Sequence, residues 1–65
     1  MENLSPRETE ILKLISKGFE NSMISKEMNL SVHTIKVYIS SIFYKLKAKN
    51  RTEAAFIAGK YKLVN

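Results

Sequence analysis

Residues 21–46 read NSMISKEMNLSVHTIKVYISSIFYKL, and this stretch decides the fold. Apolar residues recur at helical spacing on both sides of Asn29-Leu30-Ser31, which predicts a short helix over 21–28 and a longer one over 31–46. Asparagine tolerates the left-handed backbone angles that a sharp turn between two helices needs. A short helix, a tight turn and a longer helix are typical of a helix-turn-helix.

Two further helices are predicted on either side of this stretch. Ser5-Pro6-Arg7-Glu8 can open a helix over 5–17, because the serine and the glutamate each satisfy a backbone amide and proline has no amide to lose. Gly18 can adopt the left-handed conformation that ends this helix. Asn50-Arg51-Thr52-Glu53 repeats the spacing of cap and glutamate, and it predicts a fourth helix over 50–60.

Length and composition fit one small domain. The chain has 65 residues, of which 45% are hydrophobic, and it holds only two glycines and one proline. We therefore expect residues 1–65 to form a single compact all-α domain of four helices. No apolar run approaches the roughly 20 residues of a membrane span and no secretion signal is evident, so we expect a cytoplasmic protein without membrane contact.

The supply of reactive side chains argues against an enzyme. The sequence holds one histidine, His33, and neither cysteine nor aspartate, which leaves only scattered glutamates to complete a zinc site or a catalytic triad. Two glycines cannot form a loop that cradles phosphates. We expect no catalytic residue, no metal site and no cofactor.

Positive charge is concentrated in the second half of the chain. Eleven Lys and Arg residues against six Glu residues give a net charge of +5. Residues 1–32 hold four basic and five acidic groups, whereas residues 33–65 hold seven basic groups and one acidic group. This charge favours a polyanionic partner, but taken alone a solvated lysine face explains it equally well.

One face of the predicted helix over 31–46 lacks acidic residues. That face carries His33, Lys36, Val37, Ser40, Ser41 and Tyr44. A face that met only water would usually alternate Glu with Lys. Because the second helix of a helix-turn-helix lies in the major groove, this face is the candidate for reading DNA.

An ordered series of short motifs resembles a known family. The motifs are Leu4-Ser5-Pro6-Arg7-Glu8, Ile11-Leu12, Gly18, Asn21, Ile24, Leu30-Ser31, Thr34-Ile35-Lys36-Val37, Ile42, Lys45-Leu46 and Arg51-Thr52-Glu53-Ala54. Over roughly residues 4–58 the chain is similar to the DNA-binding domain of bacterial LuxR-type regulators, also called the NarL/FixJ or GerE group. The resemblance implies a transcription regulator that binds inverted half-sites in double-stranded DNA as a dimer. It also implies RNA polymerase as a further partner.

The resemblance also implies which residues meet DNA. The base-facing residues would be Lys36, Val37, His33 and Ser40. The phosphate contacts would be Asn21, Thr34, Lys45, Lys47, Lys49 and Arg51. Of these, Lys45 and Arg51 could equally be structural. Two departures concern helix ends: Glu20 stands where the family has a Ser or Thr cap, and Lys47 where it usually has Gly.

The predicted helix over 50–60 offers a second surface. Its run Ala54-Ala55-Phe56-Ile57-Ala58 covers more than one face, so part of it should be exposed. We expect a weak homodimer contact there, formed by Ala55, Phe56 and Ala58. The alternative function is a protein-interaction module that uses this apolar surface. A promoter reader resembling sigma factor region four is a further alternative, against which Arg51-Thr52-Glu53-Ala54 argues.

Overall fold

The computed structural model describes residues 3–64, and within that range it contains helices and no strand. The helices are α1 (Pro6–Ser16), α2 (Asn21–Met28), α3 (Val32–Leu46) and α4 (Arg51–Lys60). Ser5, Ser31 and Asn50 precede α1, α3 and α4, and each side chain accepts a hydrogen bond from a first-turn amide. The predicted all-α architecture of four helices is confirmed.

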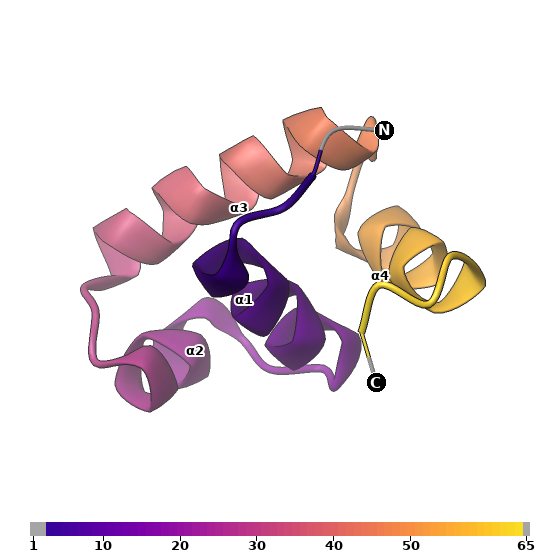
Figure 1. Ribbon diagram of the computed structural model, residues 1–65. Coiled ribbons are helices and arrows are strands. Elements are labelled where there is room, and N and C mark those ends of the chain that lie inside the picture. The colour runs from indigo at the N-terminus through magenta and orange to yellow at the C-terminus, as the bar shows by residue number, and fades with distance from the viewer. Residues whose placement is uncertain (1–2, 65) are drawn as a thin grey trace.

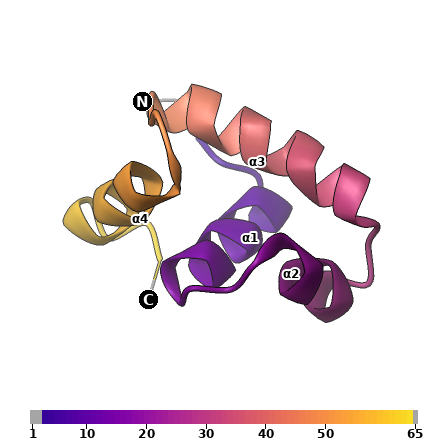
Figure 2. The ribbon, with the colours of Figure 1, turned by 180° about the vertical axis from the view of Figure 1, so that it is seen from behind.

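The α1 helix lies at the centre of the domain and contacts each of the other three helices (Figure 1). The α3 helix spans one side, and it contacts α2 near its start and α4 near its end. Seen from behind, α2 and α4 lie on opposite sides of α1, with α3 crossing above them (Figure 2). One long side of α3 therefore packs on the core while its other side remains open.

The core is aliphatic, and all four helices contribute to it. Its buried members are Ile11, Leu12, Leu14, Ile15, Ile24, Ile35, Ile39, Ile42, Leu46, Ala54 and Ala58. The small side chains of Ala54 and Ala58 let α4 approach α1 closely, and both are fully buried. The prediction that Ala58 contributes to a dimer contact is therefore wrong, because its methyl group lies inside the domain.

Each of the four helices ends with a residue in the left-handed conformation. These residues are Gly18, Asn29, Lys47 and Lys62, with φ angles of 87°, 57°, 56° and 54°. The amide of the residue that follows each one donates to a carbonyl five positions back, as in the Schellman motif. The terminating roles predicted for Gly18 and Asn29 are confirmed. Lys47 ends α3 in the same way, with a side chain in a conformation that suits glycine.

Candidate nucleic-acid interface

The open side of α3 presents the residues that the sequence predicted to read DNA. His33, Lys36, Val37 and Ser40 are all exposed, and the apolar Val37 side chain is 57% exposed. A turn of about 100° per residue places these four residues and Tyr44 within an arc of about 100° around the helix. The structure thus brings the predicted base contacts together on one surface.

Ser41 lies at the edge of this surface and turns toward the interior. It is half-buried, and its hydroxyl donates a hydrogen bond of 2.6 Å to Oε2 of Glu8 on α1. The open side of α3 therefore excludes Ser41, which the sequence predicted to lie on it.

Glu8 is a buried carboxylate that joins α1 to α3. It is 4% exposed, and its Oε1 accepts hydrogen bonds of 2.8 Å from the Ser5 amide and from Nζ of Lys45. Burial raises the pKa of the Glu8 carboxyl, but the hydrogen bonds from Lys45, Ser41 and Ser5, together with the Lys45 charge, outweigh burial. They lower the pKa from 4.5 to about 2. Glu8 is therefore ionised at neutral pH and holds α3 against α1.

The sequence predicted only part of this arrangement. The capping box between Ser5 and Glu8 is confirmed by hydrogen bonds in both directions. The partners on α3 lie 33 and 37 residues further along the chain, and no local pattern indicates them. Lys45 has the structural role that was one of its two predicted roles, and its side chain is 25% exposed.

Arg51 connects the start of α4 to the start of α2. Its Nη1 donates to Oδ1 of Asn21 at 2.7 Å and its Nη2 donates to the carbonyl of Phe19 at 2.6 Å. Glu20 precedes α2, but its side chain caps no amide of the helix. It therefore does not take over the capping role that Ser or Thr has at this position in the family. A guanidinium group and a helix N-terminus both attract anions, and the Arg51 bonds bring the two together at the start of α2.

The other predicted phosphate contacts lie at the two ends of α3. At the start, Oγ of Ser31 accepts a hydrogen bond of 3.1 Å from the Thr34 amide and donates to the Thr34 hydroxyl at 2.9 Å. Lys47 and Lys49 follow the end of α3 and are exposed. The Lys49 amide donates to Glu53 at 2.9 Å, which holds the connection between α3 and α4 in place.

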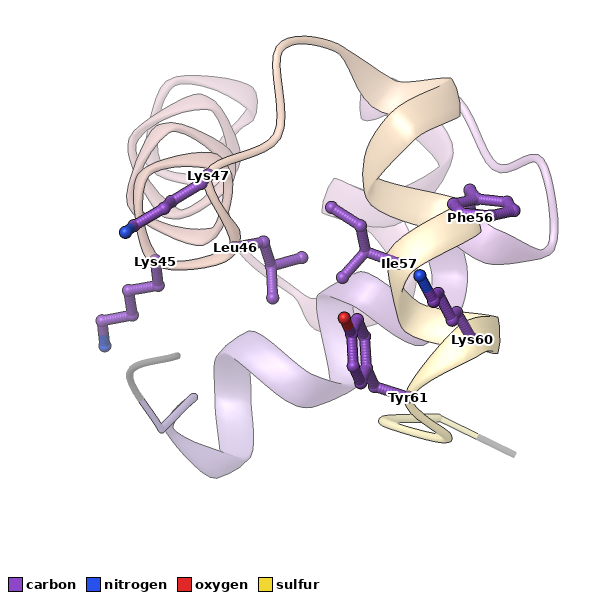
Figure 3. Close-up of a pocket in the computed structure, with 7 residues that line it drawn as sticks. All are labelled: Lys45, Leu46, Lys47, Phe56, Ile57, Lys60 and Tyr61. Carbon is purple, nitrogen blue, oxygen red and sulfur yellow. The ribbon is translucent and has the colours of Figure 1, made fainter.

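The α4 helix presents a second surface, and this one is partly apolar. Phe56 is 66% exposed and Ala55 is half-buried. A shallow cleft with a volume of about 260 Å³ lies between the end of α3 and α4. Figure 3 shows Leu46 and Ile57 facing one another in this cleft beside Tyr61, while the side chains of Lys45 and Lys47 extend away from it. The residues that line the cleft are Lys45, Leu46, Lys47, Phe56, Ile57, Lys60 and Tyr61.

Metal-ligating side chains do not gather anywhere within residues 3–64: no three of them stand close enough to hold an ion. Over the same range, none of the helices combines the length and the hydropathy that crossing a membrane requires.

Comparison with known protein families identifies the fold's relatives. Residues 2–58 match the family described as "Bacterial regulatory proteins, luxR family". The chain belongs to the LuxR family. LuxR-type helix-turn-helix domains bind DNA to regulate transcription, and they are not enzymes. The predicted family, the predicted DNA-binding role in transcription regulation and the prediction that this domain is not an enzyme are therefore confirmed.

Individual relatives share this LuxR-type domain. The nitrate/nitrite response regulator protein NarL of Escherichia coli K12 is 44% identical over 52 residues, which cover 80% of this chain and 24% of NarL. The response regulator protein VraR of Staphylococcus aureus is 38% identical over 63 residues, covering 97% of this chain and 30% of VraR. The chain therefore spans less than a third of these curated relatives.

A solved structure confirms the fold. The crystal structure of the response regulator ChrA, from a heme-sensing two-component system, superposes with a TM-score of 0.92 at 33% sequence identity. The match covers 98% of this chain and 32% of the ChrA chain. The four-helix arrangement is thus the arrangement of a response-regulator domain.

Proposed function

We propose that this LuxR-type domain binds specific sequences in double-stranded DNA by placing α3 in the major groove, and that it does so in the bacterial cytoplasm. The observation that carries the proposal is the open side of α3, which has no acidic residue and is presented by a helix fixed to the core on its other side. The salt bridge between Glu8 and Lys45 adds to this fixation, so the reading surface is held before DNA arrives.

The base contacts in this proposal come from the first half of α3. Lys36 donates to O6 and N7 of guanine, and the exposed Val37 side chain packs against a thymine methyl group. His33 and Ser40 flank them and donate to bases or to phosphates. One lysine is the only long cation on this side, so each half-site contributes modest affinity and useful affinity needs two domains.

The phosphate contacts come from the ends of the motif. Asn21 and Arg51 already bond to one another, and together with the start of α2 they form a positively polarised site for one strand of the backbone. Lys47 and Lys49 serve the other strand beyond the end of α3. Lys45 is paired with Glu8, and it contributes to the surrounding field rather than by direct contact.

The proposed homodimer forms through α4, with Phe56 as its central side chain and Ala55 beside it. This patch is smaller than the roughly 800 Å² per partner of a standard interface, so dimerisation is weak and is assisted by DNA. The exposure of Phe56 is also what favours the alternative function, a protein-interaction module. The contact with RNA polymerase stays a prediction.

Fluorescence anisotropy tests the proposal. A labelled random duplex and duplexes carrying selected inverted repeats are titrated with the chain between about 50 and 200 mM salt, where phosphate contacts produce a steep loss of affinity. Lys36→Ala should weaken binding by about 1–3 kcal/mol and relax the sequence preference. Lys17→Ala, an exposed lysine at the end of α1, is the matched control and should bind like the wild type.

Two outcomes would contradict the proposal. If the wild type binds neither duplex at about 50 mM salt, where non-specific contacts are strong, DNA is not the partner and the surface of α4 becomes the leading site. If Lys36→Ala keeps both the affinity and the sequence preference of the wild type, α3 does not read bases through this residue.

A further inference from the structure

Tyr44 is an aromatic side chain on α3 to which the proposed contacts assign no role. Its side chain is 77% exposed, more than any other exposed large hydrophobic residue within residues 3–64. No hydrogen bond joins its hydroxyl to another group in that part of the chain, whereas Ser41 on the same helix is bonded to α1. Neither packing nor internal hydrogen bonding explains an aromatic ring at this position.

The direction of Tyr44 matches that of the proposed base contacts. At about 100° per residue, Tyr44 lies within about 20° of both His33 and Val37 around the axis of α3. The tyrosine therefore leaves the helix on the side that faces the groove. It is not among the residues that line the cleft between the end of α3 and α4.

The height of Tyr44 along α3 determines what it meets. Eight residues separate it from Lys36, which at about 1.5 Å per residue is about 12 Å along the axis. The major groove is itself about 12 Å wide, and the recognition helix contacts base edges through its N-terminal residues. With the N-terminal residues of α3 at the base edges, a side chain about 12 Å further along the axis lies beyond the base contacts, toward the sugar-phosphate backbone.

We propose that Tyr44 donates its phenolic hydroxyl to a DNA phosphate at the edge of the major groove and thereby sets the register of α3. This inference rests on the proposed function. Tyrosine is among the side chains that donate to phosphates, and such contacts position a protein without reading sequence. Lys47 and Lys49 bring positive charge to the same end of α3, where the negative end of the helix dipole would otherwise repel a phosphate.

The test uses the whole chain with Tyr44→Phe, which removes only the hydroxyl. Anisotropy titrations with the random duplex and with the selected inverted repeats should each show affinity about ten-fold weaker, as expected for a lost hydrogen bond to a charged group. The ratio of the two affinities should not change. The slope of log affinity against log salt should also stay the same, because a neutral tyrosine releases no counterion.

Tyr61→Phe is the matched control, because Tyr61 is also exposed, at 54%, but it follows α4. This variant should bind both duplexes like the wild type. Thermal unfolding followed by circular dichroism should give the wild-type midpoint for Tyr44→Phe, since the lost hydroxyl has no partner among residues 3–64. Any change in DNA affinity is then a change in contact.

Three results would overturn the inference. Equal affinity of Tyr44→Phe and the wild type would show that the hydroxyl makes no contact. A loss confined to the selected sequences would make Tyr44 a base reader, and a changed salt slope would indicate a displaced lysine. A wild type that binds neither duplex would refute the proposed function itself, which is a separate and distinguishable failure.

Discussion

Replacing Glu8 with glutamine removes the buried charge that joins α1 to α3 while preserving the size of the side chain. The pKa of Glu8 is lowered from 4.5 to about 2 in the folded state. At about 1.36 kcal/mol per pKa unit, the ionised carboxylate contributes up to about 3 kcal/mol to the free energy of unfolding. Glu8→Gln also leaves Lys45 without its partner, but that side chain is 25% exposed and reaches water.

We therefore expect Glu8→Gln to lower the free energy of unfolding by about 2–3 kcal/mol at pH 7, less than the loss when a fully buried pair is broken. For a domain of this size, a loss of about 1 kcal/mol lowers the unfolding midpoint by roughly 4–8 °C. The variant should accordingly unfold roughly 10–20 °C below the wild type. Glu10→Gln is the control, because Glu10 lies exposed on the same helix.

The pH dependence gives an independent check of the same carboxylate. Because the pKa of Glu8 is lower in the folded state, the unfolded chain binds the proton more readily between pH 4.5 and about 2. The stabilisation is complete above pH 4.5 and is lost as the pH falls toward 2. The difference in stability between wild type and Glu8→Gln should therefore narrow over that range.

Urea unfolding monitored by circular dichroism, repeated at pH 7, 4 and 3, measures both effects. Two results would refute the reasoning. One is a loss below about 0.5 kcal/mol at pH 7, the range of ordinary surface substitutions. The other is a difference between wild type and variant that stays constant down to pH 3, because the carboxylate would then have an ordinary pKa when folded.

Three further predictions concern single side chains. Lys49→Ala should weaken binding to all duplexes alike and lower the salt slope by about 1, which anisotropy measures; a loss limited to selected sequences would contradict a phosphate role. Lys47→Gly should raise the free energy of unfolding, measured with urea, by about 1 kcal/mol, because φ is 56° at this position and glycine adopts such angles without strain. Lys47→Ala keeps the β-carbon, and its free energy of unfolding should show no such gain. Phe56→Glu should abolish DNA-assisted dimerisation in sedimentation experiments, and a stable wild-type dimer at micromolar concentration without DNA would contradict the weak interface proposed.

The helices were predictable from sequence because the signals that delimit them are local. Ser5, Ser31 and Asn50 each bond to an amide three residues later, so the cap and its partner stand in the same short stretch of sequence. Gly18 and Asn29 end helices through their own backbone angles. The predicted bounds differ from the observed ones by one residue where a cap was counted as helical.

Tertiary contacts were not predictable in the same way. Periodicity could not show which alanine of α4 meets α1, because five consecutive apolar residues leave the buried face undetermined. Packing decides it by size, since Ala54 and Ala58 fit the close contact and Phe56 stays outside. Likewise, the capping box predicted one role for Glu8, but its bonds to Ser41 and Lys45 depend on how α3 crosses α1.

Different residues of α3 serve stability and recognition. Ile35, Ile39 and Ile42 pack the helix on the core, and the exposed residues of its other side do not contribute to that packing. Substitutions at Lys36 or Tyr44 should therefore change DNA affinity at constant stability. Glu8 lies on α1 and faces the interior, so its loss should change stability first, with affinity following only as far as α3 is released from α1. The reverse result would be a loss of stability on substitution of Lys36 or Tyr44, together with a loss of DNA affinity but not of stability on substitution of Glu8. It would mean that the orientation of α3 depends on DNA rather than on the fold.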